Sequence, residues 1–255
     1  MNALNSEMMQ TEDKQISLTD PDARSMATSG RGSGVQSAVD TKHHLIVAHE
    51  VTNVGSDRSQ LSRMTEQART AIGSEAIEAV ADRGYYSGEE ILVCEEAGIT
   101  VYLPKPMTSG VNAKGRFGKQ DFVYVATDDV YLCPAGEQLA YHYTNEEDGK
   151  TLRRYWTTAC QGCALKDQCT TGKERRISRW EHEAVLEAVQ ARLDRNPDKM
   201  RVRRQTVEHV DGIDPLPDET LKHVSTEMAL HILAYNMKRV MSIPGVGGLM
   251  EAIRA

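Results

Sequence analysis

Long apolar runs are missing from this chain of 255 residues, and no stretch approaches the roughly 18 consecutive apolar residues of a membrane-spanning helix. The N-terminus has neither the basic start nor the apolar segment of a secretory signal. Cysteine is scarce too, because five residues are too few for a disulfide scaffold at this length. These absences predict a cytoplasmic protein with no membrane partner.

The chain also has fewer basic than acidic residues, and its net charge is −7. An acidic total argues weakly against nucleic acid, but phosphate binding depends on the local density of cations. Residues 173–204 contain ten Lys and Arg against six Asp and Glu, a local charge of +4. A DNA-binding segment therefore remains compatible with the acidic total.

The order of sequence patterns predicts an α/β fold. Two short β-branched runs within residues 35–51 are typical of a hairpin, and residues 56–72 have a capped helical pattern that ends at Gly73. Strand, helix and strand patterns then follow between residues 76 and 103, which indicates parallel pairing with helices on the sheet faces. We expect one mixed sheet, with the hairpin first and the parallel strands after it.

Two helical faces are predicted in the segments that flank the middle of the chain. The first places Leu61, Met64, Ala68 and Ile72 on one side of a helix. The last helical segment, residues 224–240, carries a buried stripe that includes Met228 and Ile232, and two further helices are expected within residues 180–209.

The alternation of strands and helices breaks between residues 105 and 172, which suggests an insertion. We therefore predict five segments: an irregular or disordered arm at 1–34, the first part of the core at 35–104, the insertion with a cysteine cluster at 105–172, the helical second part of the core at 173–242, and a tail at 243–255.

Asp82 is the first candidate for a chemical role, because it closes a predicted strand of an open α/β sheet. Ligands bind such sheets at the carboxyl ends of their strands, and a carboxylate there suits a hard divalent cation. The alternative is that Asp82 starts the turn through Gly84 or caps the next helix. The stretch alone leaves both interpretations open.

Glu208 is the candidate partner carboxylate. Arg201, Arg204 and Glu208 follow one another on successive turns of a predicted helix. The carboxylate could coordinate metal while the planar guanidinium groups meet phosphate oxygens. An ordinary solvated helix, with Glu208 paired to Arg204, is the alternative.

Several motifs together resemble bacterial insertion-sequence transposases of the DDE type. They are ADRGYYS (81–87), VEH (207–209), DPDARSM (20–26), the hairpin QSAVDTKHHLIV (36–47) with VTNVGSD (51–57), and LAYNMKR (233–239). The resemblance spans residues 19–241 and implies an RNase H-like core. It also implies DNA as the substrate, at insertion-sequence ends, and is compatible with a homo-oligomer in the DNA complex.

Carried over by position, the resemblance makes Asp82 the second acidic residue of the catalytic triad and Glu208 the third. In the family two Asp and one Glu bind a pair of Mg²⁺ ions that activate water or a 3′-hydroxyl for attack on a phosphodiester. The family's first Asp lies on a strand upstream of the DPDAR segment, and the chain is expected to lack it. We therefore predict an N-terminally truncated and internally deleted relative with impaired cleavage. An unpaired sheet edge should result from the missing strand.

Four of the five cysteines form a second group of candidate metal ligands, in addition to Asp82 and Glu208. Cys160 and Cys163 have the C-x₂-C spacing of a zinc knuckle, and Cys133 and Cys169 could complete a tetrahedral structural Zn²⁺ site. This arrangement also resembles the cysteine-bearing insertion in one branch of the same transposases. Half-buried free thiols are the alternative, whereas Cys94 on a predicted helix is expected to be a small core residue.

Basic residues beyond the insertion are candidates for contacts with a DNA backbone. They are Arg175, Arg176 and Arg179, in addition to Arg201 and Arg204 on the helix of Glu208. A solvated basic segment is the alternative. Two other functions stay open: an inactive transposase remnant that only binds DNA or the full-length transposase, and a metal-dependent nuclease on a related fold.

Overall fold

The computed structural model describes residues 34–106, 115–208, 221–245, 248 and 251. The predicted arm at 1–34, apart from Gly34, and the loop expected between the last two helices lie outside this part. The chain divides into two compact units, one formed by Met1–Lys105 with Ala188–Ala255 and the other by Pro106–Glu187. Each unit is described by itself.

The first unit begins with the predicted hairpin, which is confirmed. Strands β1 (Gly34–Val39) and β2 (Ile46–Thr52) pair antiparallel. The Asp40 carboxylate fixes the turn, because it accepts hydrogen bonds from the backbone N–H groups of Lys42 and His43 at 3.2 and 2.7 Å. Such side-chain-to-backbone bonds are the reason aspartate favours turns.

A short 3-10 turn, η1 (Asp57–Ser59), leads into helix α2 (Leu61–Ile72), which confirms the predicted helix. Gly73 ends α2 in the left-handed conformation, at φ 70°, which glycine adopts without the strain of a Cβ. The predicted apolar face is buried at Leu61, Met64 and Ala68. The prediction that Ile72 is buried was wrong: this residue is 51% exposed, because it lies in the last turn of the helix.

The predicted strand, helix and strand are also confirmed. They are β3 (Glu78–Val80), α3 (Gly88–Glu96) and β4 (Thr100–Tyr102), and the two strands pair parallel. Cys94 is fully buried in α3, as expected for a core residue.

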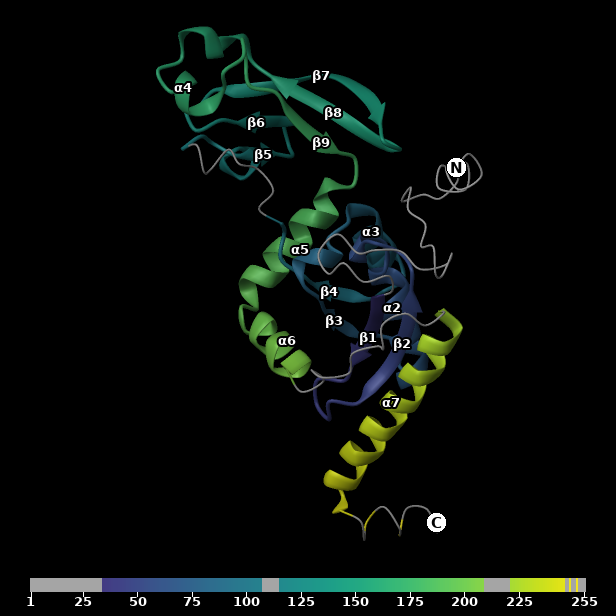
Figure 1. The fold of residues 1–255 in the computed structure, drawn as a ribbon. Coiled ribbons are helices and arrows are strands. Elements are labelled where there is room, and N and C mark those ends of the chain that lie inside the picture. Colours follow the sequence, from purple (N-terminus) through teal and green to yellow (C-terminus); the bar gives the residue numbers. More distant parts are fainter. Residues whose placement is uncertain (1–33, 107–114, 209–220, 246–247, 249–250, 252–255) are drawn as a thin grey trace, which may run out of the picture. The chain divides into compact units, whose positions relative to one another are not determined.

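The expected single mixed sheet was wrong for the described residues. The hairpin and the parallel pair form two separate two-stranded sheets, because β1 and β3 make no ladder of hydrogen bonds with each other. The architecture is nevertheless mixed α/β and consistent with an RNase H-like core, with β4, β3, β1 and β2 drawn in that order across Figure 1.

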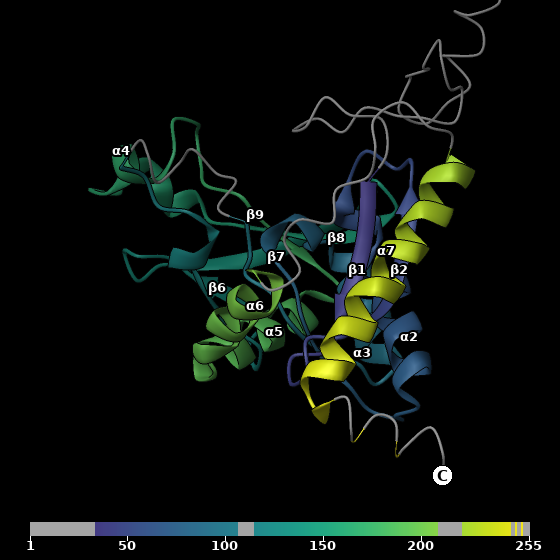
Figure 2. The ribbon, with the colours of Figure 1, turned by 60° about the horizontal axis from the view of Figure 1, so that its bottom comes forward.

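Three helices are described after residue 180, as predicted: α5 (Glu183–Arg195), α6 (Asp198–Glu208) and α7 (Leu221–Ser242). Helix α7 lies along the hairpin in both ribbon views (Figures 1 and 2). Its side chains Val224, Met228 and Ile232 form a core cluster with Ile46 of β2.

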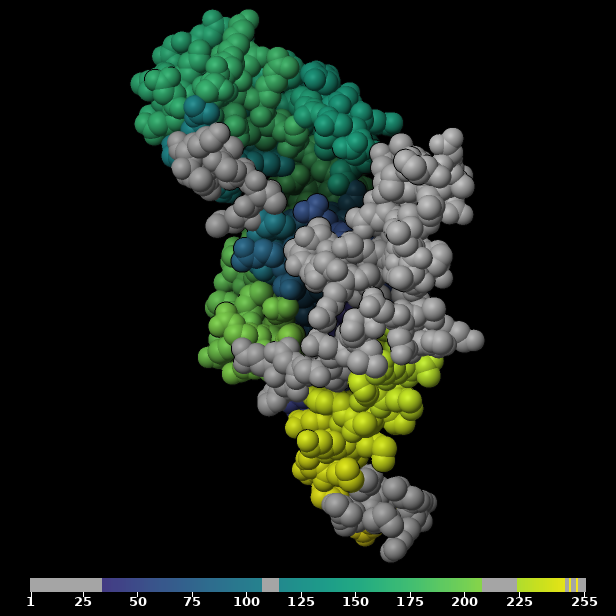
Figure 3. Space-filling view, in the orientation of Figure 1, coloured from purple at the N-terminus to yellow at the C-terminus, as the bar shows by residue number. Residues whose placement is uncertain are grey.

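Asn236 fastens α7 to the hairpin. Its side-chain oxygen accepts from the Ile46 N–H at 2.9 Å, and its amide nitrogen donates to the Ile46 carbonyl at 2.8 Å. The opposite side of α7 reaches the molecular surface (Figure 3), where Leu230, Leu233 and Met237 are each more than half exposed. Among the described helices, none has the length and apolar character that a membrane crossing requires.

The second unit is an antiparallel sheet of five strands in sequence order. These are β5 (Val123–Val125), β6 (Val130–Leu132), β7 (Gln138–Glu147), β8 (Lys150–Trp156) and β9 (Ile177–Trp180). Because β9 pairs with β8, the unit extends past residue 172, where the insertion was expected to end.

Aromatic side chains form the core of this unit. Tyr155 is fully buried and makes an edge-to-face contact with Tyr131 at a centroid distance of 5.2 Å. The hydroxyls of Tyr155 and Tyr124 both donate to Asp129 Oδ1 at 2.7 Å. Burial opposes ionisation of Asp129, but the two tyrosine hydrogen bonds and the charge of Arg153 lower its pKa overall. Asp129 therefore anchors two tyrosine hydroxyls of this core.

Candidate metal and nucleic-acid site

Asp82 lies two residues after the end of β3 and caps the short 3-10 turn η2 (Arg83–Tyr85). Its Oδ1 accepts the Gly84 N–H at 2.8 Å. A Cβ at residue 84 would lie 2.9 Å from that oxygen, so glycine is the residue that permits this close approach. The turn role considered for Asp82 is thus present, and the second carboxylate oxygen remains for other partners.

That second oxygen meets Arg203 of α6. The Arg203 NH2 atom lies 2.9 Å from Asp82 Oδ2, and both side chains are about one-third to two-fifths exposed. Sequence reasoning missed Arg203, because it chose the helix face of Arg201 and Arg204. The burial of Thr206 identifies the inward face of α6, on which Arg203 lies one turn earlier. The sequence offers no separate signal for this choice.

A second carboxylate, Asp57, lies near Asp82. The same hypothetical Cβ at residue 84 would be 3.6 Å from Asp57 Oδ2. Gln36 of β1 donates to Asp57 Oδ1 at 2.7 Å and accepts a hydrogen bond from the Tyr85 hydroxyl. Burial, followed by the charges of Asp57 and Asp82, raises the pKa of Tyr85 well above its usual value, so this hydroxyl stays a donor.

Glu208 is the last residue of α6, and its side chain lies outside the described part of the structure. Arg201 and Arg204 are exposed on the same helix. Arg201 makes an ion pair with Asp198 one turn earlier, at 3.0 Å. The two arginines are therefore open to a ligand in solvent, whereas the predicted pairing of Asp82 with Glu208 stays a prediction.

Within residues 34–106, 115–208 and 221–245, no group of three or more His, Cys, Asp or Glu side chains is arranged to hold a metal ion. The carboxylates of Asp82 and Asp57 both lie within 4 Å of the position that a Cβ at residue 84 would take. The described carboxylates therefore do not by themselves make a site for a pair of Mg²⁺ ions.

The three predicted DNA contacts of the second unit differ in their surroundings. Arg176 has an exposed side chain that pairs with Glu174 at 2.8 Å and lies over Trp156. Arg175 lies over the Phe122 ring, with a buried Nε that has no hydrogen-bond partner among the described residues. Arg176 is thus exposed, whereas Arg175 is half-buried.

Arg179 is buried, with a residue exposure of 7%. Its guanidinium binds both oxygens of Glu187, donates to the Tyr131 hydroxyl at 3.2 Å, and lies 3.7 Å from the centroid of Tyr124. Burial opposes the charge of Arg179, but the hydrogen bonds to Glu187 and Tyr131 raise its pKa overall. In this arrangement the guanidinium contributes to the core and does not face a DNA backbone.

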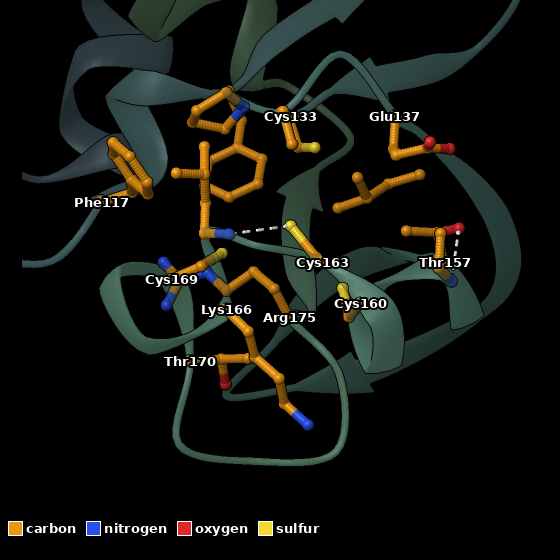
Figure 4. Close-up of a pocket in the computed structure, with 16 residues that line it drawn as sticks. Phe117, Cys133, Glu137, Thr157, Cys160, Cys163, Lys166, Cys169, Thr170 and Arg175 are labelled. Atoms are coloured by element: carbon orange, nitrogen blue, oxygen red, sulfur yellow. Dashed lines mark hydrogen bonds between the residues drawn. The ribbon is translucent and has the colours of Figure 1, made fainter.

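The four cysteines of the second unit come from three elements and line one small cavity (Figure 4). Cys133 follows β6; Cys160 and Cys163 lie in and after η5 (Thr158–Gly162); Cys169 ends α4 (Lys166–Cys169). All four are free thiols. The cavity that they share has a volume of about 20 Å³, and the Zn²⁺ site stays a prediction.

Two groups beside the cavity could interact with the sulfur atoms. The Cys163 Sγ accepts the Leu165 N–H at 3.4 Å. Burial raises the pKa of Cys169 overall, and the charge of Arg175, which also lines the cavity, opposes only part of that shift. Because the buried Arg175 Nε has no acceptor among the described residues, a thiolate in the cavity would give it one.

Comparison with known proteins finds a family match. Residues 132–241 match the family model described as a transposase DDE domain. The matched stretch includes Glu208 and the four clustered cysteines, but not Asp82. The match supports a DDE transposase. No curated protein and no solved structure matches the chain.

Proposed function

We propose that this chain is the core of a DDE transposase, which binds DNA and acts on its phosphodiester bonds with divalent metal ions. The family match at residues 132–241 carries the proposal. The position of Asp82 supports it, because this carboxylate follows a parallel strand and is tied to α6, the helix that ends at Glu208. The roles of Asp82 and Glu208 as metal ligands belong to the proposal.

Intact members of this family imply a divalent metal such as Mg²⁺, which would activate the attacking oxygen and stabilise the leaving one. Asp82 and Glu208 are the residues that would hold it. Arg201 and Arg204 would contact phosphate oxygens near Glu208, since their side chains are exposed on the same helix. Arg176 would supply a further contact from the second unit.

We further propose that cleavage by this chain is impaired. Arg203 occupies one oxygen of Asp82, and Gly84 the other, so a metal ion must displace the guanidinium before it can use this carboxylate fully. Such an arrangement weakens metal binding at Asp82 and therefore disfavours strand cleavage. It keeps open the alternative of an inactive remnant that binds DNA or the full-length transposase.

The proposal predicts slow, Mg²⁺-dependent cleavage of duplex DNA that carries the insertion-sequence ends flanking the coding region. Asp82→Asn should reduce the rate by more than about 100-fold, since even indirect supports of metal ligands contribute about 10- to 100-fold. The control is Asp194→Asn, an exposed aspartate of α5, which should leave the rate unchanged. Product formation on denaturing gels measures both.

Three outcomes distinguish the transposase from the two alternative functions. Salt-sensitive binding without cleavage would support the remnant. Equal cleavage of DNA with and without the ends would support a general metal-dependent nuclease. Neither binding nor cleavage would contradict the proposal as a whole.

A structural Zn²⁺ site at Cys133, Cys160, Cys163 and Cys169 is a separate proposal about the second unit. It is supported by their shared cavity and by the half-buried Arg175 beside it, whose Nε is buried. The thiols must rotate to meet at one point, because their present arrangement does not hold a metal ion. A tetrahedral tetrathiolate site carries net negative charge, which Arg175 would partly neutralise.

A further inference from the structure

The five-stranded sheet of the second unit carries aromatic side chains on the face that is turned away from its core. Tyr143 of β7 is the cross-strand partner of Arg154 of β8, and Trp156 follows Arg154 two residues later. Cross-strand partners, and residues two apart in a strand, share a face of the sheet. Tyr155 points to the opposite face, where it is fully buried in the core. Tyr143 and Trp156 therefore belong to the outer face of the sheet.

Two further side chains of β7 gather around Trp156 on this outer face. The pairing of β7 with β8 shifts between Tyr141 and Tyr143, and such a bulge changes the direction of the side chain of the extra residue, His142. The His142 ring is stacked on Trp156 at a centroid distance of 3.4 Å and an angle of 6°. Tyr143 meets Trp156 edge-on at 5.8 Å. Because His142 and Tyr143 are both exposed, an incoming ring can extend this aromatic group.

A cation completes the group. Arg176 directly precedes β9, and its guanidinium lies 4.8 Å from the centroid of the Trp156 ring. The side chain of its ion-pair partner, Glu174, is only 9% exposed, against 59% for Arg176. The pair therefore presents its positive member to solvent, beside the aromatic rings. An exposed guanidinium in such a weak pair can contact a phosphate.

Exposed rings beside an exposed cation match the chemistry of an unpaired nucleotide. Every base offers a flat face on which an aromatic side chain can stack, and a guanidinium suits the phosphate that follows it. Bases inside a duplex are stacked on one another, so they do not offer these faces. Stacking of two or three bases on aromatic side chains of a β-sheet is an established mode of single-strand recognition.

We propose that the aromatic group of His142, Tyr143 and Trp156, together with Arg176, binds unpaired nucleotides of single-stranded DNA. A base would stack on the exposed ring of His142 or Tyr143, and Arg176 would contact a neighbouring phosphate. The inference deepens the proposed function and rests on it for DNA as the ligand. It assigns unpaired strands to the outer face of the second unit, which duplex DNA would not need.

The test uses the full chain and a fluorescent oligothymidylate of about 15 nucleotides. Saturable binding is expected by fluorescence anisotropy. An abasic strand of the same length keeps the phosphates and removes the bases. It should bind at least about fivefold more weakly, because each stacked base contributes a factor of about five or more.

Protein variants locate the contact. Tyr143→Ala should weaken single-strand binding at least about fivefold, whereas Tyr143→Phe, which retains the ring, should bind like the parent chain. Tyr141→Ala is the matched control, because Tyr141 is also an exposed aromatic residue but lies on the face of Tyr155. The affinity for a duplex of the same length should be unchanged in all three variants.

The outcomes separate this inference from the proposed function. A chain that binds duplex but not single-stranded DNA would overturn the inference alone, and would leave the outer face for a protein partner. Equal binding of the abasic strand and the oligothymidylate, or unchanged single-strand binding by Tyr143→Ala, would also overturn it, because phosphate contacts alone would then account for the affinity. A chain that binds neither form of DNA would contradict both proposals.

Discussion

Arg179→Ala is expected to lower the free energy of unfolding of the second unit by about 2–4 kcal/mol, through lost packing and lost hydrogen bonds. The side chain of Arg179 is 8% exposed, and it bridges Glu187 of α5 to Tyr131 of β6 while covering the ring of Tyr124. Its removal leaves a cavity above two tyrosines. Denaturant unfolding followed by tyrosine fluorescence measures the loss.

The partner and a neighbour provide controls. Glu187→Ala should also destabilise the unit, because it leaves a buried guanidinium with the Tyr131 hydroxyl as its remaining oxygen acceptor among the described residues. Arg176→Ala should change stability by no more than about 0.5 kcal/mol, since its side chain is 59% exposed.

DNA affinity should rank these arginines in the opposite order. Arg176→Ala removes an exposed cation, so it should weaken binding and reduce the salt dependence of the affinity. Arg179→Met should leave the salt dependence unchanged, because the guanidinium is enclosed in the core. A salt slope reduced by Arg179→Met but not by Arg176→Ala would contradict the structural assignment.

Local sequence signals predicted the elements of the first unit because each depends on neighbours in the chain. The Asp40 turn and the Gly73 stop are determined within a few residues. The buried positions of α2 follow from helical periodicity up to Ala68. Ile72 departed from the pattern because periodicity cannot tell where along a helix the packing partner ends.

The environment of the candidate site could not be predicted in the same way. Asp82 was found because it follows a strand, but its partners come from distant segments: Arg203 is 121 residues away. Three arginines lie close together in α6, and composition gives no reason to prefer one of them. Which arginine meets Asp82 is decided by the face of α6 that buries Thr206.

Arg179 illustrates the same limit for charge. A run of basic residues is an ambiguous signal, because a cation in the run can either face solvent or be enclosed by partners far along the chain. Tyr131 lies 48 residues before Arg179, and no local pattern connects them. The sequence therefore identifies the basic segment. Which of its arginines are exposed and which are buried depends on contacts with residues far along the chain.

Removal of Zn²⁺ is expected to have the largest effect on the second unit. The purified chain should contain about one zinc ion, and chelation should destabilise the unit by about 4 kcal/mol if free zinc had exceeded Kd a thousandfold. The physical reason is that Cys133, Cys160, Cys163 and Cys169 come from a strand end and two short helical turns, which a common ligand would hold together.

Metal analysis of serine variants distinguishes this site from four free thiols. Cys160→Ser and Cys163→Ser should each lose zinc and lower the unfolding midpoint of the second unit. Cys94→Ala is the control, because Cys94 is buried in α3 of the first unit and should affect stability there without changing zinc content. The proposal would be contradicted if the parent chain contained no zinc, or if both serine variants retained all of it. Arg175→Met should weaken zinc binding without abolishing it, since it removes a neighbouring charge and none of the sulfur ligands.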